Sequence, residues 1–273
     1  MCGNISRMKL QIVKDNILYT KAKDVAKWMN EFFVQKIRTI RNNFGLTPAN
    51  YQHCKQSMSG KRCKMYLQHV TVKKVTKVIK NLKSSKSLSV DELDSYSLKI
   101  SADIVGPAVH HIVTLSIMQS KFSDPCKYAK VLPLHKKEDV LVSKNYRPVS
   151  ILSPLSKILE RIVFEQVYSY FNKNKIFHPN LMGYRKNRST LTAALQMYDR
   201  LVRGAADGKI SGVVLLDLSA AFDLVCPEIL IRKLRIYGIQ DDCLDWFYSY
   251  LTDRKQAVWI DHVCLTGQML KWL

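Results

Sequence analysis

The stretch VVLLDLSAAFD, Val213 to Asp223, decides how this sequence is interpreted. Its four consecutive apolar residues, Val213 to Leu216, are typical of a β-strand buried on both faces. Asp217 closes the run, and a carboxylate at the exit of a buried strand is costly unless its charge is needed, most often by a divalent metal. On this stretch alone, the alternative is equally compatible: Asp217 caps a following helix and has no chemical role.

The composition favours a folded protein with a polyanionic partner. The 273 residues are 47% hydrophobic, which is enough for one large domain or two small ones with a substantial core. The formal net charge of +21 and the isoelectric point near 9.7 favour nucleic acid over a membrane as partner. Between Glu31 and Asp91 the sequence has 13 basic residues and no acidic one, so this interval needs an external anion or an acidic neighbour.

The cysteines and the hydropathy exclude several other classes of protein. The seven cysteines form no C-x-x-C pair, and the seven histidines do not lie at metal-ligand spacing with them. We therefore expect reduced core cysteines in an intracellular protein, and the pattern leaves open whether it is nuclear or cytoplasmic. No apolar run approaches the ~18 residues of a membrane span, and the N-terminus lacks the apolar core of a signal peptide, so no membrane partner is expected.

Periodicity and capping residues predict the elements along the chain. The first 50 residues are expected to be mostly helical, with an amphipathic helix over 22–40. AKVLPLHKK and NYRPVSIL predict an antiparallel hairpin over 129–152, with Lys136, Lys137 and Arg147 near its open end. A strand is predicted over 255–263, and further helices over 103–120, from Ser153-Pro154 onward, from Ser189 to about 206, over 227–237, and over 241–251, where Asp241-Asp242 opens a helix.

Two basic segments are candidate nucleic-acid contacts. In the predicted amphipathic helix over 70–82, valines, an isoleucine and a leucine occupy one side and Lys73, Lys74, Lys77 and Lys80 surround it, which suits contact with a phosphate backbone. The alternative is a solvated linker helix.

The second segment is LMGYRKNRSTLTAA, Leu181 to Ala194. Gly183 permits a turn there, and Ser189 caps the helix that follows. Cations before a helix N-terminus oppose its dipole, so a bound phosphate would relieve a cost at Arg185, Lys186 and Arg188. The alternative is an ordinary basic loop.

Three of these motifs, in this order, resemble the reverse transcriptases of non-LTR retrotransposons, the long interspersed and jockey-like elements. Those enzymes carry D-L-S-x-A-F-D after an apolar strand, Y-R-P-[VI]-S in a hairpin, and G-[FY]-R-x-x-[RH]-S-T-x-x-A. The resemblance covers about residues 90–273. It implies an α+β fold of the right-hand polymerase type, with fingers and a partial palm over 89–273 after a basic helical linker region over 1–88.

The resemblance also implies roles for individual residues. Asp217 matches the carboxylate that binds the two catalytic Mg²⁺ ions, and Phe222 matches the floor of the nucleotide pocket. An RNA template, a DNA primer and a deoxynucleoside triphosphate are the implied partners. The implied triphosphate clamp comprises Lys136, Lys137 and Arg147, and the implied template contacts are Arg185, Lys186 and Arg188.

Part of the family pattern does not occur in the sequence. The relatives continue with a P-Q-G-S turn, a hairpin carrying A-D-D, and a thumb. Two divalent ions about 4 Å apart cannot be held by Asp217 alone. We therefore expect a truncated polymerase that is inactive by itself, with an exposed palm edge at Val213–Leu216. The alternatives are a non-catalytic RNA- or DNA-binding protein and an interaction module that pairs through that edge.

Overall fold

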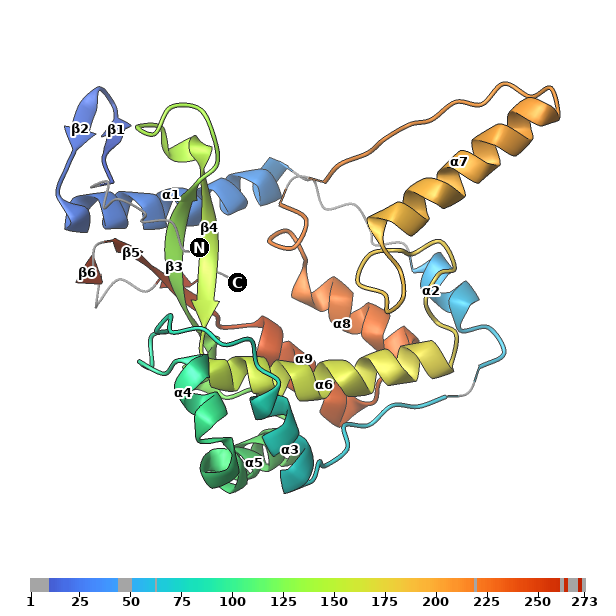
Figure 1. Cartoon of the computed structure of the whole chain (residues 1–273), viewed down its shortest axis with the longest axis horizontal. Helices are drawn as coiled ribbons and strands as arrows, with labels where there is room; N and C mark the ends of the chain where they lie inside the picture. The colour runs from blue at the N-terminus through green and yellow to red at the C-terminus, as the bar shows by residue number, and fades with distance from the viewer. Residues whose placement is uncertain are drawn as a thin grey trace.

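A computed structural model describes residues 10–43, 51–61, 63–218 and 220–260, together with the backbone of 263–264 and 270–271. A twisted sheet stands beside a long N-terminal helix, and a group of helices lies against one end of that sheet (Figure 1). Ser219, in the central motif, lies outside the described residues. So do residues 261 and 262 of the strand predicted over 255–263. Within the described part of the chain, every helix is too short or too polar to cross a lipid bilayer.

A small hairpin precedes the first helix. β1 (Ile12–Lys14) and β2 (Ile17–Tyr19) pair antiparallel, and α1 (Ala22–Asn43) follows. The helix predicted over 22–40 is confirmed, but the expectation of a mostly helical beginning is wrong over these two strands. Asp15 and Asn16 adopt positive φ angles of 50° and 62°, which suit the tight turns that join paired strands and which Asp and Asn tolerate better than most residues.

The predicted hairpin forms the centre of the sheet. β3 (Tyr128–His135) and β4 (Tyr146–Leu152) pair antiparallel with Leu134 opposite Arg147, which confirms the prediction. Short 3₁₀ turns, η1 (Asp124–Lys127) and η2 (Ser143–Asn145), precede these strands.

The other edge of β3 receives a strand from the far end of the sequence. β5 (Lys255–Ile260) runs parallel to β3, with Val131 opposite Val258. β6 (Val263–Cys264) and β7 (Leu270–Lys271) both pair antiparallel with β5. The sheet therefore joins the hairpin of β3 and β4 to the last described residues.

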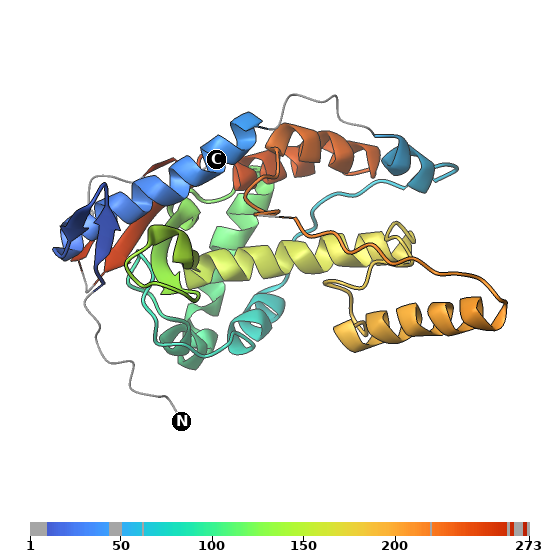
Figure 2. The same ribbon diagram turned by 90° about the horizontal axis from the view of Figure 1, so that it is seen from above.

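The helix α1 covers one face of this sheet, as Figure 2 shows from above. Its apolar stripe is buried against the strands: Val25, Met29 and Phe33 belong to the same core as Val131 and Val258. The apolar residues that recur with the 3.6-residue period of a helix therefore lie on the buried face of α1.

A second core lies among the helices. It unites α3 (Val72–Lys80), α4 (Ser95–Ile100), α5 (Ala102–Met118), α6 (Pro154–Lys173) and α9 (Asp241–Leu251). Trp246 is fully buried there, and its indole N–H donates to the Ser116 hydroxyl at 2.9 Å. Ser153 caps α6 by accepting a bond from the Leu155 amide at 3.1 Å, which confirms the predicted start.

A third, smaller core ties the basic N-terminal region to the C-terminal helices. It lies near α2 (Gln52–Ser57) and α8 (Pro227–Ile236) and buries Met65 against Ile239. The Met65 amide donates to the Gly238 carbonyl at 2.9 Å, and the Gln240 amide donates to the Met65 carbonyl at 3.0 Å. Residues before and after position 88 therefore pack in the same hydrophobic cores. The division into a linker region over 1–88 and a polymerase domain over 89–273 stays a prediction.

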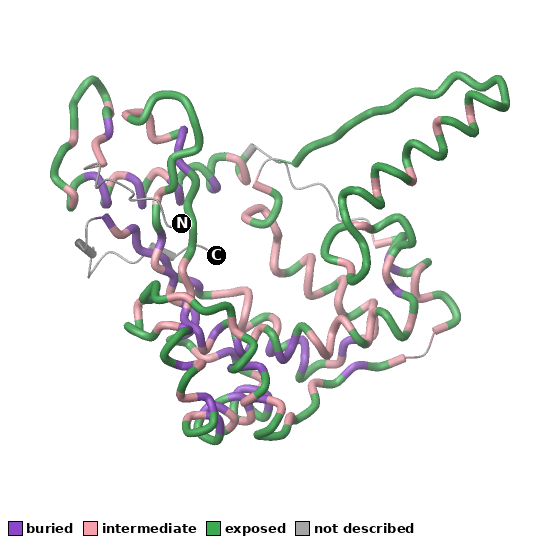
Figure 3. The backbone as a smooth tube through the Cα atoms, viewed as in Figure 1, coloured by how far each residue is buried: buried purple, intermediate pink, exposed green. Residues whose placement is uncertain are grey.

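The helix α7 (Thr190–Ala206) stands away from these cores in both views (Figures 1 and 2). Ser189 and Thr192 form a reciprocal capping box, which confirms the predicted helix start. None of the α7 residues is buried, although the helix is amphipathic. The segment that returns from its end is likewise exposed (Figure 3).

The prediction of a buried strand over Val213–Leu216 is wrong for this structure. The run has no strand pairing, and the exposed fractions of Val214 and Leu216 are 82% and 89%. The expected exposed palm edge is therefore an exposed apolar segment and not the edge of a sheet. The physical reason is that burial on both faces requires neighbouring strands and covering helices, and the strands of the described residues are engaged elsewhere, beside α1.

Candidate nucleotide and nucleic-acid site

The turn after Asp217 is anchored to the end of α1. The amides of Asp223 and Leu224 both donate to the Ala220 carbonyl, at 3.0 and 3.1 Å, and Ala220 has a positive φ of 53°. The Arg41 guanidinium donates to the Asp223 carbonyl at 2.9 Å and approaches the Val225 carbonyl at 3.5 Å. Residues 220–225 thus form a tight turn, and the distant Arg41 holds it.

A small cavity of about 110 Å³ joins this turn to the sheet. Ala220 and Asp223 line it from the turn, Pro148 and Ser150 from β4, and the remaining walls are Phe33, Lys36, Ile37 and Gln256. Burial raises the pKa of the Asp223 carboxyl above its ordinary value, although Lys36 and Arg41 favour its ionised form. One strand of the hairpin motif and the turn of the central motif therefore line the same cavity.

Two of the motif aromatics also meet. The rings of Tyr184 and Phe222 lie edge to face, with centroids 6.1 Å apart and an interplanar angle of 85°. Both side chains are largely exposed, which leaves aromatic surface free for a ligand. The structure thus brings the G-Y-R segment to the residue that the sequence predicts as the floor of a nucleotide pocket.

The basic residues of the G-Y-R segment fall into two kinds. The Arg185 guanidinium lies over the Phe177 ring at 4.5 Å from its centroid, so it is partly occupied in packing. Lys186 and Arg188 are exposed, and the Lys186 amide donates a hydrogen bond to the Tyr168 hydroxyl at 2.8 Å. The positive φ angles of this loop fall at Tyr184 and Asn187, whereas the sequence pointed to Gly183 as the turn residue.

The three cations of the hairpin are exposed at its loop end, because residues 136–145 connect β3 to β4; the predicted position near the open end is therefore wrong. The Lys136 amide donates to the Asn145 carbonyl at 2.8 Å, which extends the ladder by one bond beyond β3. Lys136, Lys137 and Arg147 are all exposed. Because side chains alternate along a strand, Arg147 projects from the face of β4 opposite to Pro148, and hence away from the cavity beside Asp223.

Asp217 is exposed. Among the described residues, no group of three or more His, Cys, Asp or Glu side chains could hold a metal ion. A pair of Mg²⁺ ions needs several carboxylate oxygens, so the donor set around Asp217 does not fit the two-metal centre that the family resemblance implies.

The lysines of α3 differ in their surroundings. Lys74 is paired with Glu165, and the Lys80 ammonium lies 2.7 Å from Asp103. Lys73 and Lys77 are exposed. Half of the predicted set is therefore neutralised within the chain, which a sequence pattern could not reveal because both acidic partners lie on other helices.

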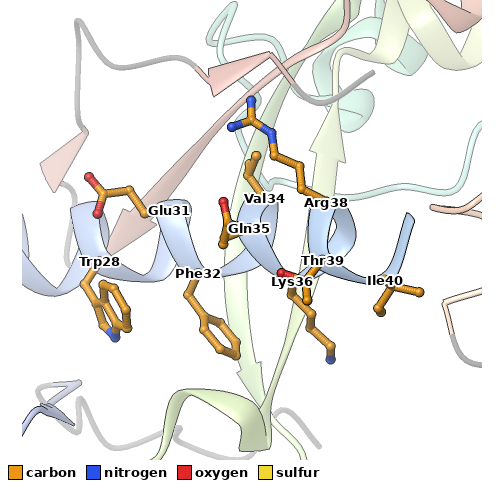
Figure 4. A pocket seen from close by; sticks show the side chains of 9 residues that line it. All are labelled: Trp28, Glu31, Phe32, Val34, Gln35, Lys36, Arg38, Thr39 and Ile40. Carbon is orange, nitrogen blue, oxygen red and sulfur yellow. The ribbon is translucent and has the colours of Figure 1, made fainter. Parts of the chain in front are cut away.

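A further depression, of about 670 Å³, runs along α1. Trp28, Phe32 and Lys36 project from one side of the helix, whereas Glu31 and Arg38 project from the other (Figure 4). The Lys14 ammonium lies 3.7 Å from the Trp28 ring centroid. Sequence reasoning missed both this depression and the anchoring role of Arg41, since neither has a local signal beyond the amphipathic period.

Comparison with known proteins supports these motifs. Residues 134–268 match the family described as reverse transcriptase (RNA-dependent DNA polymerase). The chain is 26% identical over 205 residues to a probable RNA-directed DNA polymerase from transposon BS of Drosophila melanogaster, which covers 70% of this chain and 21% of that protein.

Two other relatives belong to named mobile elements. One is the RNA-directed DNA polymerase from mobile element jockey of Drosophila melanogaster, 23% identical over 76% of this chain and 24% of its own length. The other is the retrovirus-related Pol polyprotein from type-1 retrotransposable element R2 of Popillia japonica, 25% identical over 54% of this chain and 20% of its own length. The chain thus spans about a quarter or less of these curated relatives.

Proposed function

Since this chain belongs to the reverse transcriptase family through residues 134–268, we propose that it contributes the fingers and the first palm motif of an RNA-directed DNA polymerase of a non-LTR retrotransposon. The observation that carries the proposal is the contact between motifs. Phe222 lies against Tyr184, and its turn shares a cavity with the Y-R-P-V-S strand. Three motifs that are separate in sequence thus converge on one region.

The residues of this region suit the binding of a nucleotide and a template. Phe222 and Tyr184 offer exposed aromatic faces on which a base or a sugar can rest. Arg147 projects from the other face of β4, where with Lys136 and Lys137 it offers exposed cations for a triphosphate, because a guanidinium matches phosphate oxygens two at a time. Lys186 and Arg188, with Arg185 behind them, are available for the backbone of an RNA template annealed to a DNA primer.

The proposal assigns binding, and not the complete chemistry, to these 273 residues. Nucleotide addition in this family uses divalent ions, and Asp217 offers one carboxylate for them. Among the described residues no cluster of acidic side chains completes a metal site with Asp217, so no catalytic step is assigned to Asp217 alone.

The test is the binding of a fluorescent deoxynucleoside triphosphate, followed by anisotropy. Arg147→Ala is expected to weaken binding about tenfold, which corresponds to one charge-assisted hydrogen bond. Arg203→Ala is the matched control, because Arg203 is an exposed arginine already paired with Asp199 on α7. Equal effects of the two variants would show that the Y-R-P match is structural only.

A second candidate function is association with another protein chain through the segment Val213–Leu218. The specific observation is that this apolar run is exposed and has no strand partner within the described residues. Such unpaired extended segments readily add to a sheet edge. Complex formation that ignores salt and is abolished by Leu215→Lys would favour this function over nucleic-acid binding.

A further inference from the structure

A basic depression lies between α3 and α6, and two of the candidate lysines of α3, Lys74 and Lys77, line it together with residues that have not been assigned a role above. Its volume is about 470 Å³. Three segments supply its cations: α3, the residues just after α3, and the first half of α6. The cations are Lys74, Lys77, Lys83, Lys157 and Arg161, and Glu165 is the one carboxylate among the lining residues.

That single carboxylate is already engaged. Glu165 pairs with Lys74 through one oxygen and accepts a bond from the Arg161 Nε at 2.8 Å through the other. Burial would raise the pKa of Glu165, but these two hydrogen bonds outweigh it and hold the pKa below its ordinary value. Glu165 therefore stays ionised at neutral pH and neutralises only part of the charge around it.

Three lysines remain without such a partner. Lys77, Lys83 and Lys157 are exposed, and none of them forms an ion pair with an acidic side chain of the described residues. They come from three segments and line one depression, so their charges add over a short distance. An anionic ligand with several charges would be held there more firmly than at any single lysine.

An aromatic depression adjoins the basic one. It has a volume of about 550 Å³ and shares Lys157 and Arg161 with its neighbour. Phe164, on α6, is 47% exposed at its wall, and the Arg161 guanidinium lies 5.7 Å from the Phe164 ring centroid. Cations and an exposed ring thus stand side by side on one helix.

We propose that single-stranded nucleic acid crosses α6 at this place, with phosphates on Lys77, Lys83 and Lys157 and a base stacked on Phe164. Lysines suit the backbone because they are point charges that replace its counterions, and an aromatic face accepts any base. An acidic peptide would match the lysines but would have no planar group for Phe164. The inference deepens the proposed function by giving the nucleic acid a path, and it rests on that function only for the class of ligand.

The experiment measures binding of a fluorescent oligouridine RNA by anisotropy over a series of salt concentrations. Lys77→Ala/Lys83→Ala/Lys157→Ala is expected to lower the affinity at least tenfold and to reduce the salt slope by roughly 2, at about 0.7 per phosphate contact of a single strand. Phe164→Ala is expected to lower the affinity roughly tenfold without changing the slope.

The matched control is Lys21→Ala/Lys23→Ala/Lys27→Ala, which removes the same charge from exposed lysines at the start of α1. This control variant is expected to keep most of the RNA affinity and most of its dependence on salt concentration. If wild-type protein binds RNA and the two triple variants behave alike, the path across α6 is wrong while the proposed function stands. If polyglutamate displaces the RNA equally well from wild-type and Phe164→Ala protein, the site is one for acidic peptides and the inference fails. Arg147→Ala tests the proposed function separately.

Discussion

The Arg41 guanidinium donates a hydrogen bond of 2.9 Å to the backbone carbonyl of Asp223, across a sequence separation of 182 residues. This bond ties the last turns of α1 to the turn that carries Phe222. It makes the N-terminal helix part of the site, although that helix lies outside the matched residues 134–268.

Arg41→Ala should loosen the turn at Ala220–Val225. The lost bond involves a charged donor, and such bonds contribute about 1.5–3 kcal/mol. The amides of Asp223 and Leu224, which both donate to the Ala220 carbonyl, should exchange with deuterium at least tenfold faster. Arg38→Ala is the control, since Arg38 is exposed on the same helix. Unchanged exchange in Arg41→Ala would mean that the turn is held by its own bonds.

Asp223→Asn should stabilise the protein at neutral pH. Burial raises the pKa of Asp223, so its folded state binds a proton more tightly than its unfolded state. The stability from this group is therefore complete below the unfolded pKa near 3.8 and is lost as the pH rises through the higher folded pKa.

Urea denaturation of Asp223→Asn and wild type at several pH values checks this sign. The advantage of the asparagine variant should be present at pH 7 and shrink as the solution is acidified. Asp217→Asn is the control, because a substitution at this exposed position should change the stability at pH 7 little. A variant less stable than wild type at pH 7 would show that Lys36 and Arg41 more than offset the burial of the carboxylate.

Gly238→Ala should destabilise the protein more than Gly208→Ala. Both glycines have positive φ angles, 87° and 69°, which cost a side chain about 1–2 kcal/mol. A Cβ at position 238 would also lie 2.4 Å from the Cys63 carbonyl oxygen, whereas the space around Gly208 is open. The difference between the two losses of unfolding free energy isolates the clash, and equal losses would contradict the close packing of Cys63 on Gly238.

Leu216→Ala should leave the stability almost unchanged, within about 0.5 kcal/mol, because its side chain is exposed. Ile158→Ala, in the buried core of α6, should cost about 2–5 kcal/mol. Thermal unfolding of the two variants compares these sites directly. A large loss of stability in Leu216→Ala would show that this side chain is buried, as the sequence predicted.

The polypeptide of residues 1–273 should not extend a DNA primer on an RNA template with Mg²⁺ or Mn²⁺. Asp217 is one carboxylate, and the described residues provide no group of acids beside it. Preorganised charge at both ends of the displacement supplies most of the rate advantage, so its loss is expected to remove detectable extension. Extension that disappears in Asp217→Ala would show that carboxylates from elsewhere complete the site.

Local features of this chain were predictable from sequence. The helices over 22–40, 103–120 and 189–206 have clear periods or caps, and each formed where the pattern placed it. The hairpin of β3 and β4 followed from two apolar runs and a short polar connection. These predictions succeed because hydrogen bonds within a helix or a hairpin, and the residues that cap them, are close in sequence.

Contacts between distant segments were decided only by the tertiary structure. The parallel pairing of β5 with β3, the anchoring of Asp223 by Arg41 and the pairing of Lys74 with Glu165 have no local signal. The run Val213–Leu216 shows the limit most clearly. Its apolar residues favour an extended chain, but a strand also needs a neighbour for its backbone, and burial needs cover on both faces. Those partners come from other segments, so the same four residues are a core strand or an exposed segment according to what the fold sets beside them.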